Sequence, residues 1–218
     1  MKRFVVIGLG NFGSSVAESL QTQRHDVLAV DRSEEAVERI APMVSRAVVG
    51  DGRSVKLLEK VGAKGADAGI VSTGDDITAS ILATMALRDL NVKDIYVKVI
   101  STDHARVMEK LGARETIFPE RESGMRLAAR VSTTSILEYV PLGAGFSVQE
   151  MAVPASWIGK PLRSLNLAQR FRVSIIALHD VLMDEITAAP SPDAPLKESD
   201  TLLVAGKDED LARCARET

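Results

Sequence analysis

The chain has few of the features that stabilise small secreted proteins or hold proteins in a membrane. Its 218 residues include one cysteine, Cys214, so no intrachain disulfide can form, which suits a reducing compartment. No apolar run approaches the ~20 residues that a membrane-spanning helix needs. Met1-Lys2-Arg3 leads directly into a short strand-like run, so we expect no signal peptide. These shortages favour a cytoplasmic protein whose contact with any membrane is peripheral and made through a partner.

Positive charge is not in excess either. Lysine and arginine number 27 against 30 aspartates and glutamates, which gives a formal net charge of -3. A protein that binds nucleic acid usually carries a basic excess or a basic stripe. We therefore expect no nucleic-acid partner.

Short apolar runs alternate with longer helical segments over the first 119 residues. The pattern predicts strands at 4–7, 27–30, 47–49, 68–72, 95–100 and 115–118, and helices at 12–23, 34–40, 54–61, 76–90 and 103–111. The apolar runs are continuous, which is typical of strands buried on both faces. We expect an α/β fold, a Rossmann-like doubly wound parallel sheet with helices on both faces.

The pattern changes after Pro119. Residues 120–139 are predicted to form one long helix, ended by Pro141 and Gly143. Strands are predicted at 146–153, 173–178 and 201–205, with a short helix at 161–169 and a terminal helix at 208–216. We expect a nucleotide-binding domain over 1–119, a long connector helix over 120–141 and a smaller α+β C-terminal domain over 142–218.

The glycine-rich turn after the first predicted strand indicates a nucleotide site. Gly8 permits the sharp turn, Gly10 lets a pyrophosphate approach the backbone, and Gly13 lets the helix pack closely on the strand. The helix start adds free N–H groups and a partial positive charge. Asp31, at the end of the second strand, can accept hydrogen bonds from ribose hydroxyls. Its charge disfavours a 2′-phosphate, and so NADP, although Arg32 follows it.

Other strand ends should line the same crevice, because ligands of open α/β sheets bind at the carboxyl ends of the strands. Asp51 and Gly52 follow the third strand and are placed to hold the adenine. Lys98 lies in the fifth strand, where its ammonium reaches phosphate or forms a salt bridge at a sheet edge; the spacing leaves both open. The predicted binding residues are Gly8, Gly10, Asn11, Phe12, Gly13, Asp31, Arg32, Asp51, Gly52, Thr73, Gly74 and Lys98.

Residues for catalysis are not apparent. The sequence has no Tyr-x-x-x-Lys pair, no Gly-x-Ser-x-Gly and no Walker motif. His25, His104 and His179 are isolated and show no metal-ligand spacing. We therefore expect a regulator and no enzyme, against two alternatives: a small NAD-dependent oxidoreductase, or a standalone nucleotide or redox sensor.

Several motifs, in order, resemble one family. They are the run from Val6 to Gly13, the run from Val27 to Asp31, Gly50-Asp51, Val71-Ser72-Thr73-Gly74, Tyr96-Val97-Lys98, Lys110-Leu111-Gly112-Ala113 and Phe118-Pro119-Glu120. In the tail they are Leu162-x-x-Leu165-Asn166 and the run from Asp200 to Gly206. Together they resemble the regulator-of-potassium-conductance (RCK) subunits of bacterial Ktr and Trk potassium uptake systems, with TrkA-N and TrkA-C domains.

The resemblance implies properties that spacing does not show. Such subunits bind ATP, ADP or NAD(H) in the N-terminal domain, with Thr73 and Gly74 near sugar or phosphates. Glu120 would face a divalent cation on the nucleotide. The subunits dimerise through the connector helix, form a ring that is typically octameric, and gate an integral-membrane potassium transporter.

The sequence departs from the family pattern at two positions. Ktr subunits commonly carry an arginine where this chain has Asn11, so the choice among ATP, ADP and NAD stays open. Some C-terminal domains of the family bind cyclic di-AMP with an arginine at the position of Ala168. Here Arg170 is displaced by two residues, and cyclic di-AMP is the weaker of the expected ligands.

Overall fold

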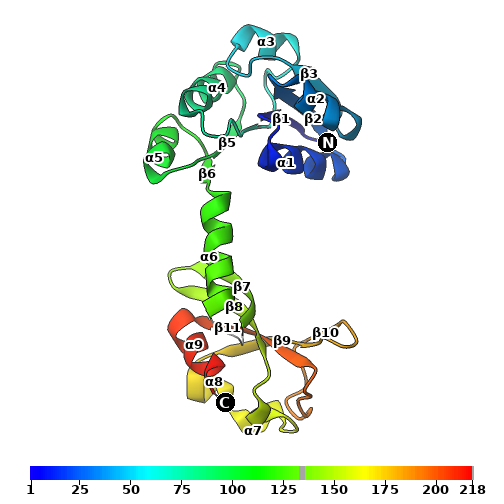
Figure 1. The fold of residues 1–218 in the computed structure, drawn as a ribbon, viewed down its shortest axis with the longest axis vertical. Helices are drawn as coiled ribbons and strands as arrows, with labels where there is room; N and C mark the ends of the chain where they lie inside the picture. Colours follow the sequence, from blue (N-terminus) through cyan, green and yellow to red (C-terminus); the bar gives the residue numbers. More distant parts are fainter. Residues whose placement is uncertain (133–135, 218) are drawn as a thin grey trace. The chain divides into compact units, whose positions relative to one another are not determined.

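The structure is a computed structural model that describes residues 1–132 and 136–217. The chain divides into two compact units, Met1–Pro119 and Glu120–Thr218 (Figure 1). Each unit is described by itself below.

The first unit is built on a six-stranded parallel sheet. Its strands lie in the order β3-β2-β1-β4-β5-β6, and every neighbouring pair is parallel. This confirms the predicted doubly wound Rossmann-like sheet. The strands are β1 (Arg3–Ile7), β2 (Asp26–Asp31), β3 (Arg46–Val49), β4 (Ala68–Val71), β5 (Asp94–Lys98) and β6 (Glu115–Ile117). The helices are α1 (Asn11–Thr22), α2 (Glu34–Ile40), α3 (Val55–Lys60), α4 (Ile77–Asp89) and α5 (Thr102–Lys110), with a short 3-10 turn, η1 (Ala41–Met43).

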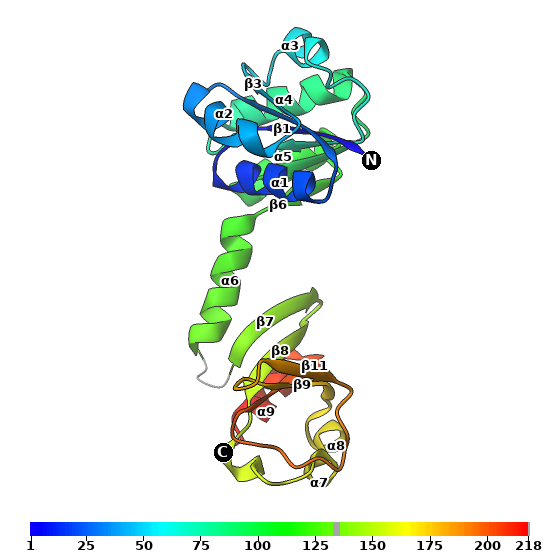
Figure 2. The same cartoon turned by 90° about the vertical axis from the view of Figure 1, so that its right-hand side faces the viewer.

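One apolar core lies on each face of the sheet, between the strands and the helices that cover that face. Alternate residues of β1 serve opposite faces: Val5 packs in the core shared with α3, α4 and α5, and Val6 in the core shared with α1 and α2. Figure 2 shows α1 on one side of the strands and α4 on the other. Because strands covered on both faces bury every residue, the central strands read as continuous apolar runs.

Local chemistry sets several helix ends. The Ser33 hydroxyl accepts a hydrogen bond from the Ala36 N–H (3.2 Å), and the Asp76 carboxylate accepts one from the Ala79 N–H (2.8 Å). Both are N-caps, which satisfy backbone donors that the first turn leaves unpaired. Gly62 and Gly112 follow α3 and α5 with φ of +96° and +83°. A left-handed residue after a helix is the usual place for glycine, so both stops have a backbone reason.

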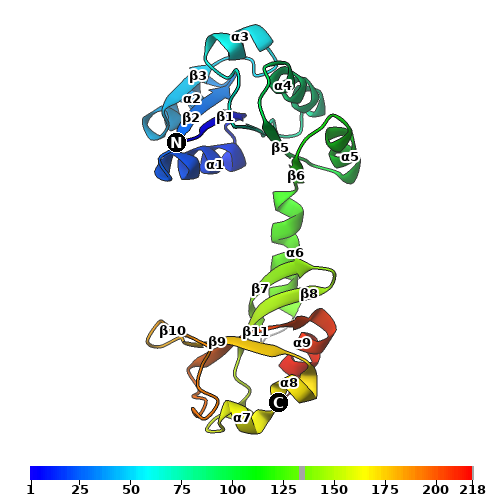
Figure 3. The ribbon, with the colours of Figure 1, turned by 180° about the vertical axis from the view of Figure 1, so that it is seen from behind.

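The second unit contains a helix and a five-stranded antiparallel sheet. The sheet order is β10-β9-β11-β8-β7, and Trp157 and Leu202 lie in its core, with α9 next to β11 and α8 beside α9 (Figure 3). The strands are β7 (Ile136–Gly143), β8 (Phe146–Ala152), β9 (Ser174–Asp180), β10 (Glu185–Ala188) and β11 (Asp200–Lys207). The helices are α6 (Pro119–Ser132), α7 (Leu162–Leu165), α8 (Leu167–Phe171) and α9 (Asp208–Ala215), with a 3-10 turn, η2 (Ala155–Trp157).

The predicted helix over 120–139 is wrong at its C-terminal end. Helix α6 is described to Ser132, and Ile136–Gly143 forms β7; residues 133–135 of the prediction lie outside the described residues. Strand β7 pairs with β8 in antiparallel register and is an edge of the sheet. An edge strand tolerates Pro141, which has no N–H to donate. The predicted connector 120–141 therefore contains most of a strand of the C-terminal sheet.

Two smaller corrections concern the same unit. The predicted helix at 161–169 is two short helices, because Asn166 between them adopts a left-handed conformation with φ of +48°. Strand β10, Glu185–Ala188, was not predicted; it has four residues, and all four are exposed. In the part of the chain that the structure describes, no helix has both the length and the apolar character needed to cross a bilayer.

Candidate functional site

A cavity of about 250 Å³ opens at the carboxyl ends of the parallel strands of the first unit. The chain order reverses between β1 and β4, and such a reversal is where open α/β sheets bind ligands. Loops after β1, β2, β3 and β4 and the start of α4 supply the walls. The lining residues are Ile7, Gly8, Gly10, Val30, Asp31, Arg32, Gly50, Asp51, Gly52, Arg53, Ser72, Thr73, Gly74, Asp76, Ala79 and Ala83.

The three glycines after β1 differ in whether contacts within the chain require a glycine at that position. Gly8 has φ of +92°, and a Cβ there would stand 2.0 Å from the Ser72 carbonyl oxygen. A Cβ on Gly13 would stand 1.9 Å from the Gly8 carbonyl oxygen, so packing inside the chain requires both glycines. A Cβ on Gly10 would meet no atom within 4 Å. Gly10 is also the N-cap of α1 and makes no side-chain cap, so the first N–H groups of that helix have no capping side chain.

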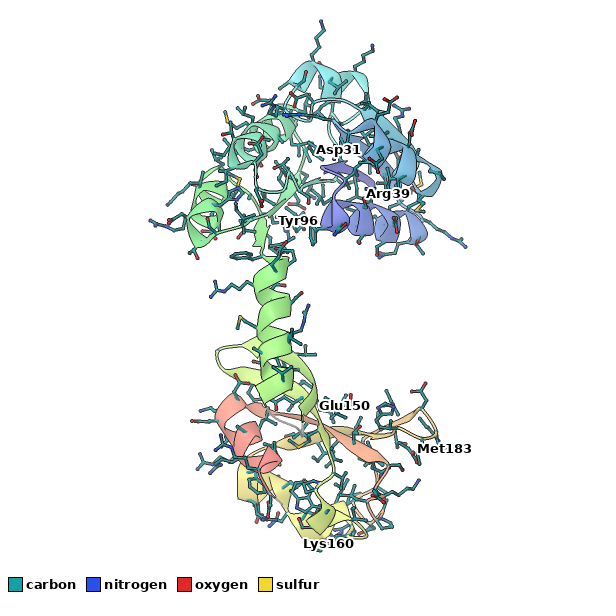
Figure 4. The ribbon with its side chains drawn as sticks, viewed as in Figure 1. Asp31, Arg39, Tyr96, Glu150, Lys160 and Met183 are labelled. Carbon is teal, nitrogen blue, oxygen red and sulfur yellow. The ribbon has the colours of Figure 1, made fainter. Side chains whose placement is uncertain are left out.

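Asp31 (labelled in Figure 4) ends β2 and is held by two backbone donors. Its Oδ2 accepts a hydrogen bond from the Leu9 N–H at 2.6 Å, and its Oδ1 accepts one from the Ser33 N–H at 2.8 Å. These bonds fix the carboxylate beside the glycine loop. A carboxylate has about four lone-pair sites, so each oxygen keeps acceptor capacity for a ligand hydroxyl.

Asp51 is the centre of a charged cluster on the next loop. Its carboxylate accepts hydrogen bonds from Arg53 Nη2 at 2.7 Å, from Arg53 Nε at 2.9 and 3.0 Å, and from Arg32 Nη2 at 3.2 Å. The Arg53 guanidinium above all, with Arg32 beside it, holds the pKa of Asp51 well below its usual range. Asp51 is therefore ionised at neutral pH and shared between two arginines.

The loop after β4 closes the far side. Thr73 donates a hydrogen bond from its hydroxyl to the Asp76 carbonyl oxygen at 3.2 Å. Gly74 adopts φ of +63°, which glycine accepts without strain. This turn places Thr73, Gly74 and Asp76 among the cavity walls.

The structure brings most of the predicted binding residues together, but not all. Gly8, Gly10, Asp31, Arg32, Asp51, Gly52, Thr73 and Gly74 line the cavity; Asn11, Phe12, Gly13 and Lys98 are not among its lining residues. The Phe12 side chain lines a separate apolar groove of about 320 Å³ with Phe4 and Tyr96 (labelled in Figure 4). In β5 the half-buried Lys98 alternates with buried Val97 and so shares the sheet face of Tyr96.

The predicted cation ligand Glu120 is in α6, which belongs to the second unit, so its role stays a prediction. Among the described residues there is no group of three or more His, Cys, Asp or Glu side chains that could hold a metal ion.

Arg53 is a lining residue that the sequence reasoning missed. It directly follows the Gly-Asp-Gly turn whose Asp51 and Gly52 were predicted, so its position at a strand end was the available signal. The sequence does not reveal that its guanidinium folds back onto Asp51. Gly52, between the two residues, packs closely on β1: a Cβ there would stand 2.2 Å from Ile7 Cγ2.

The three histidines have structural surroundings away from the cavity. His104 is buried, and its Nε2 lies 3.1 Å from the Ser80 hydroxyl, with burial lowering its pKa. His25 packs its ring against Phe4, and His179 contacts Glu150 in the second unit. None of the three is a lining residue of the cavity.

In the second unit, Arg170 is occupied by internal contacts. It donates to the Leu165 carbonyl oxygen at 3.3 Å, forms an ion pair with Glu217, and lies 4.9 Å from the centre of the Phe171 ring. The predicted cyclic di-AMP site near Ala168 stays a prediction.

The chain combines a Rossmann-like unit, with a cavity at its strand ends, and a unit built on a small antiparallel sheet, and both units match domains of TrkA-type proteins. Residues 4–119 match the TrkA-N domain and residues 148–217 match the TrkA-C domain. A Ktr system potassium uptake protein A of Bacillus subtilis is 32% identical over 99% of this chain and 96% of its own length. Its counterpart in Vibrio alginolyticus is 35% identical over 97% of this chain and 95% of its own length. The chain belongs to this family of Ktr potassium uptake proteins.

Solved structures share the fold. The GsuK channel superposes with a TM-score of 0.70 and 19% identity, covering 99% of this chain and 39% of the channel chain. The same channel bound to NAD superposes with a TM-score of 0.67 and 19% identity, covering 97% of this chain and 38% of that chain. The family membership confirms the predicted recognition: the chain is a Ktr/Trk-type regulatory subunit of potassium uptake and not an enzyme.

Proposed function

We propose that this subunit binds an adenine nucleotide, ADP, ATP or NAD(H), in the cavity of the first unit and transmits the binding to a membrane potassium transporter. The observation that carries the proposal is the pairing of Asp31 with Gly10. Asp31 is fixed where a ribose would need an acceptor, and Gly10 is a glycine that no contact within the chain requires. A glycine without an internal reason beside free helix N–H groups fits a phosphate approaching the backbone.

The ligand identity follows less directly. The charge of Asp31 disfavours a 2′-phosphate, so NAD(H) fits better than NADP(H). Asn11 is neutral where the family commonly has an arginine, which leaves ATP, ADP and NAD as candidates. The GsuK channel, of similar fold, has been solved bound to NAD. A divalent cation carried with the nucleotide, held by Glu120, and cyclic di-AMP at the second unit complete the proposal.

Regulation requires assembly. Helix α6 exposes the apolar side chains of Met125, Leu127 and Val131 to 54%, 53% and 73%. Exposed apolar side chains gathered on one helix are typical of an interaction surface. We propose that they form the seam of a homodimer, that dimers assemble into an octameric ring, and that the ring docks on the cytoplasmic side of an integral-membrane potassium transporter. The nucleotide must bind the two ring states with different affinity in order to gate the transporter.

Two measurements test the proposal. Isothermal titration of the purified chain with ADP, ATP and NAD should show binding of at least one ligand, and the absence of binding by all three would contradict it. Val131→Glu should split dimers in light scattering, because it places a charge in the proposed seam. Met43→Glu, at an equally apolar exposed site outside α6, is the matched control and should leave the mass unchanged. An unchanged mass for Val131→Glu would contradict the seam.

The transporter partner is tested in cells. A strain without potassium uptake should grow on low potassium when this chain and its transporter are expressed together, and the two should purify as one complex. Purification as a lone monomer that binds nucleotide would favour a standalone sensor instead.

A further inference from the structure

The Asp51–Arg53 pair forms a flat, fixed surface in the cavity wall. Arg53 presents Nε and Nη2 to both carboxylate oxygens, at 2.7 to 3.0 Å, and its backbone N–H donates to Asp51 Oδ1 at 3.0 Å. A two-pronged contact of this kind holds guanidinium and carboxylate in one plane. Arg32 adds a further donor, Nη2, 3.2 Å from Asp51 Oδ1.

The position of this plane matches the base end of a nucleotide. Arg32 directly follows Asp31, the proposed ribose acceptor, and donates a hydrogen bond to Asp51. This bond connects the Asp51–Arg53 pair to the proposed ribose site. Gly52 keeps the turn against Ile7, the last residue of β1. The cavity-lining residues of the described chain include no aromatic side chain. The planar groups available to a base are therefore guanidinium groups.

The charge of Arg53 favours a base over a phosphate. Asp51 is bonded to it, and the nearby Asp76 carboxylate adds a second negative charge that raises the pKa of Arg53, though less than the Asp51 hydrogen bond does. The Arg53 Nε and Nη2 groups already donate to Asp51, so a phosphate would have to compete with that carboxylate for the same donors. The Arg53 side chain is 36% exposed although these donors are bonded, and a guanidinium stacks on the π-face of an aromatic ring.

Resting on the proposed nucleotide binding, we propose that Arg53 is a specificity-determining residue that stacks on the purine base, and that Asp51 is the positioning residue that holds it flat. Asp51 does not act as the main acceptor for the base, because Arg53 and Arg32 occupy both of its oxygens. The site therefore selects purine over pyrimidine nucleotides, because the two fused rings of a purine cover more of Arg53 than the single ring of a pyrimidine.

The test compares affinities for AMP, ADP, ATP and UDP among variants of the full chain by isothermal titration. Stacking on arginine contributes ~0.5–2 kcal/mol, so Arg53→Met should weaken ADP about tenfold and UDP less than about threefold. Arg53→Lys keeps the charge without the plane and should fail like Arg53→Met. Arg53→Phe restores a plane without charge and should keep the preference for ADP over UDP. Arg46→Met, whose guanidinium donates to the Val61 carbonyl oxygen outside the cavity, is the matched control.

The positioning role of Asp51 is tested by combining Asp51→Asn with a variant of Arg53. Asp51→Asn should weaken ADP in the wild-type background and have no further effect in Arg53→Phe, because the positioned group is then absent. Losses that grow from AMP to ADP to ATP would make Arg53 a phosphate ligand and overturn the inference. An ADP to UDP ratio that Arg53→Met leaves unchanged would overturn it as well, with the proposed nucleotide function intact. If the wild-type chain binds neither these nucleotides nor NAD, the proposed function fails and the inference fails with it.

Discussion

Replacing Asp31 separates the nucleotide site from the fold that carries it. Asp31→Ala removes a carboxylate that accepts backbone hydrogen bonds from Leu9 and Ser33 at 2.6 and 2.8 Å. A hydrogen bond to a charged group contributes ~1.5–3 kcal/mol. Two ribose hydroxyls bonded to this carboxylate would therefore contribute at least ~3 kcal/mol, which is more than about a hundredfold in the dissociation constant.

The same substitution also affects stability. The Leu9 and Ser33 N–H groups lose their acceptor, and leaving a partly buried donor unpaired costs ~1–3 kcal/mol. Urea unfolding should show a lower free energy of unfolding for Asp31→Ala, by roughly 2 kcal/mol. Binding of ADP and NAD is therefore measured by isothermal titration without urea, where the variant is still folded.

Asp26→Ala is the matched control at the other end of β2. Asp26 accepts a hydrogen bond from Arg3 Nε at 2.9 Å at a partly exposed site, and such an ion pair contributes less than ~1 kcal/mol. Its nucleotide affinity should equal that of the wild-type chain. Equal affinity of Asp31→Ala and wild type, in a sample shown to be folded, would refute the role of Asp31 as the ribose acceptor.

Three further predictions concern the packing and titration of single groups. Gly13→Ala should lower the free energy of unfolding by ~1–3 kcal/mol in urea titrations, because its Cβ meets the Gly8 carbonyl oxygen at 1.9 Å; Gly124→Ala, whose Cβ meets nothing within 4 Å, should not destabilise the chain. The Glu150 carboxylate raises the pKa of His179, so the protonated pair stabilises the second unit below pH ~6.5 and the stabilisation is lost as pH rises through the raised pKa. The melting temperatures of wild type and His179→Asn should thus differ most at acidic pH and converge above it; a constant difference would contradict the pairing. Burial raises the pKa of the Cys214 thiol to about 11, so a thiol reagent at pH 8 should label it in urea and not in buffer, and fast labelling in buffer would contradict its burial.

Sequence reasoning succeeded where a local cause sets the structure. The parallel sheet followed from continuous apolar runs. Helix α2 has the predicted bounds 34–40, and a local cause fixes its start: the Ser33 hydroxyl caps the Ala36 N–H at 3.2 Å. It failed after Ser132, because β7 is defined by a partner outside its own segment. Strand β8 pairs with it, and neither the helical pattern of 120–132 nor Pro141 reveals that pairing.

For the site, sequence reasoning found the loops and could not rank the residues within them. Gly8, Gly10 and Gly13 look alike in a motif, whereas in the structure only Gly10 faces open space. Lys98 was predicted from its place in the strand; it shares the β5 face of Tyr96 and does not line the cavity, and its role stays a prediction. Arg53 was overlooked because its importance comes from a turn that folds its guanidinium back onto Asp51.

The distribution of charge in the cavity bears on which nucleotide the subunit senses. The positively charged lining residues of the described chain are Arg32 and Arg53, both on the Asp51 carboxylate, and neither belongs to the glycine loop. At the glycine loop Asn11 adds no charge, and the guanidinium at the loop is that of Arg39, whose Nη2 donates to the Leu9 carbonyl oxygen at 3.3 Å. Phosphates bound there would meet backbone N–H groups and a helix dipole equivalent to about half a unit charge, with this one guanidinium nearby. In the proposed site each added phosphate charge would then gain less than the ribose and base, which would meet Asp31 and Arg53. A site of this kind should bind AMP, ADP and NAD with similar affinity, and a subunit that used it would respond to the adenosine end of its ligand more than to the number of phosphates.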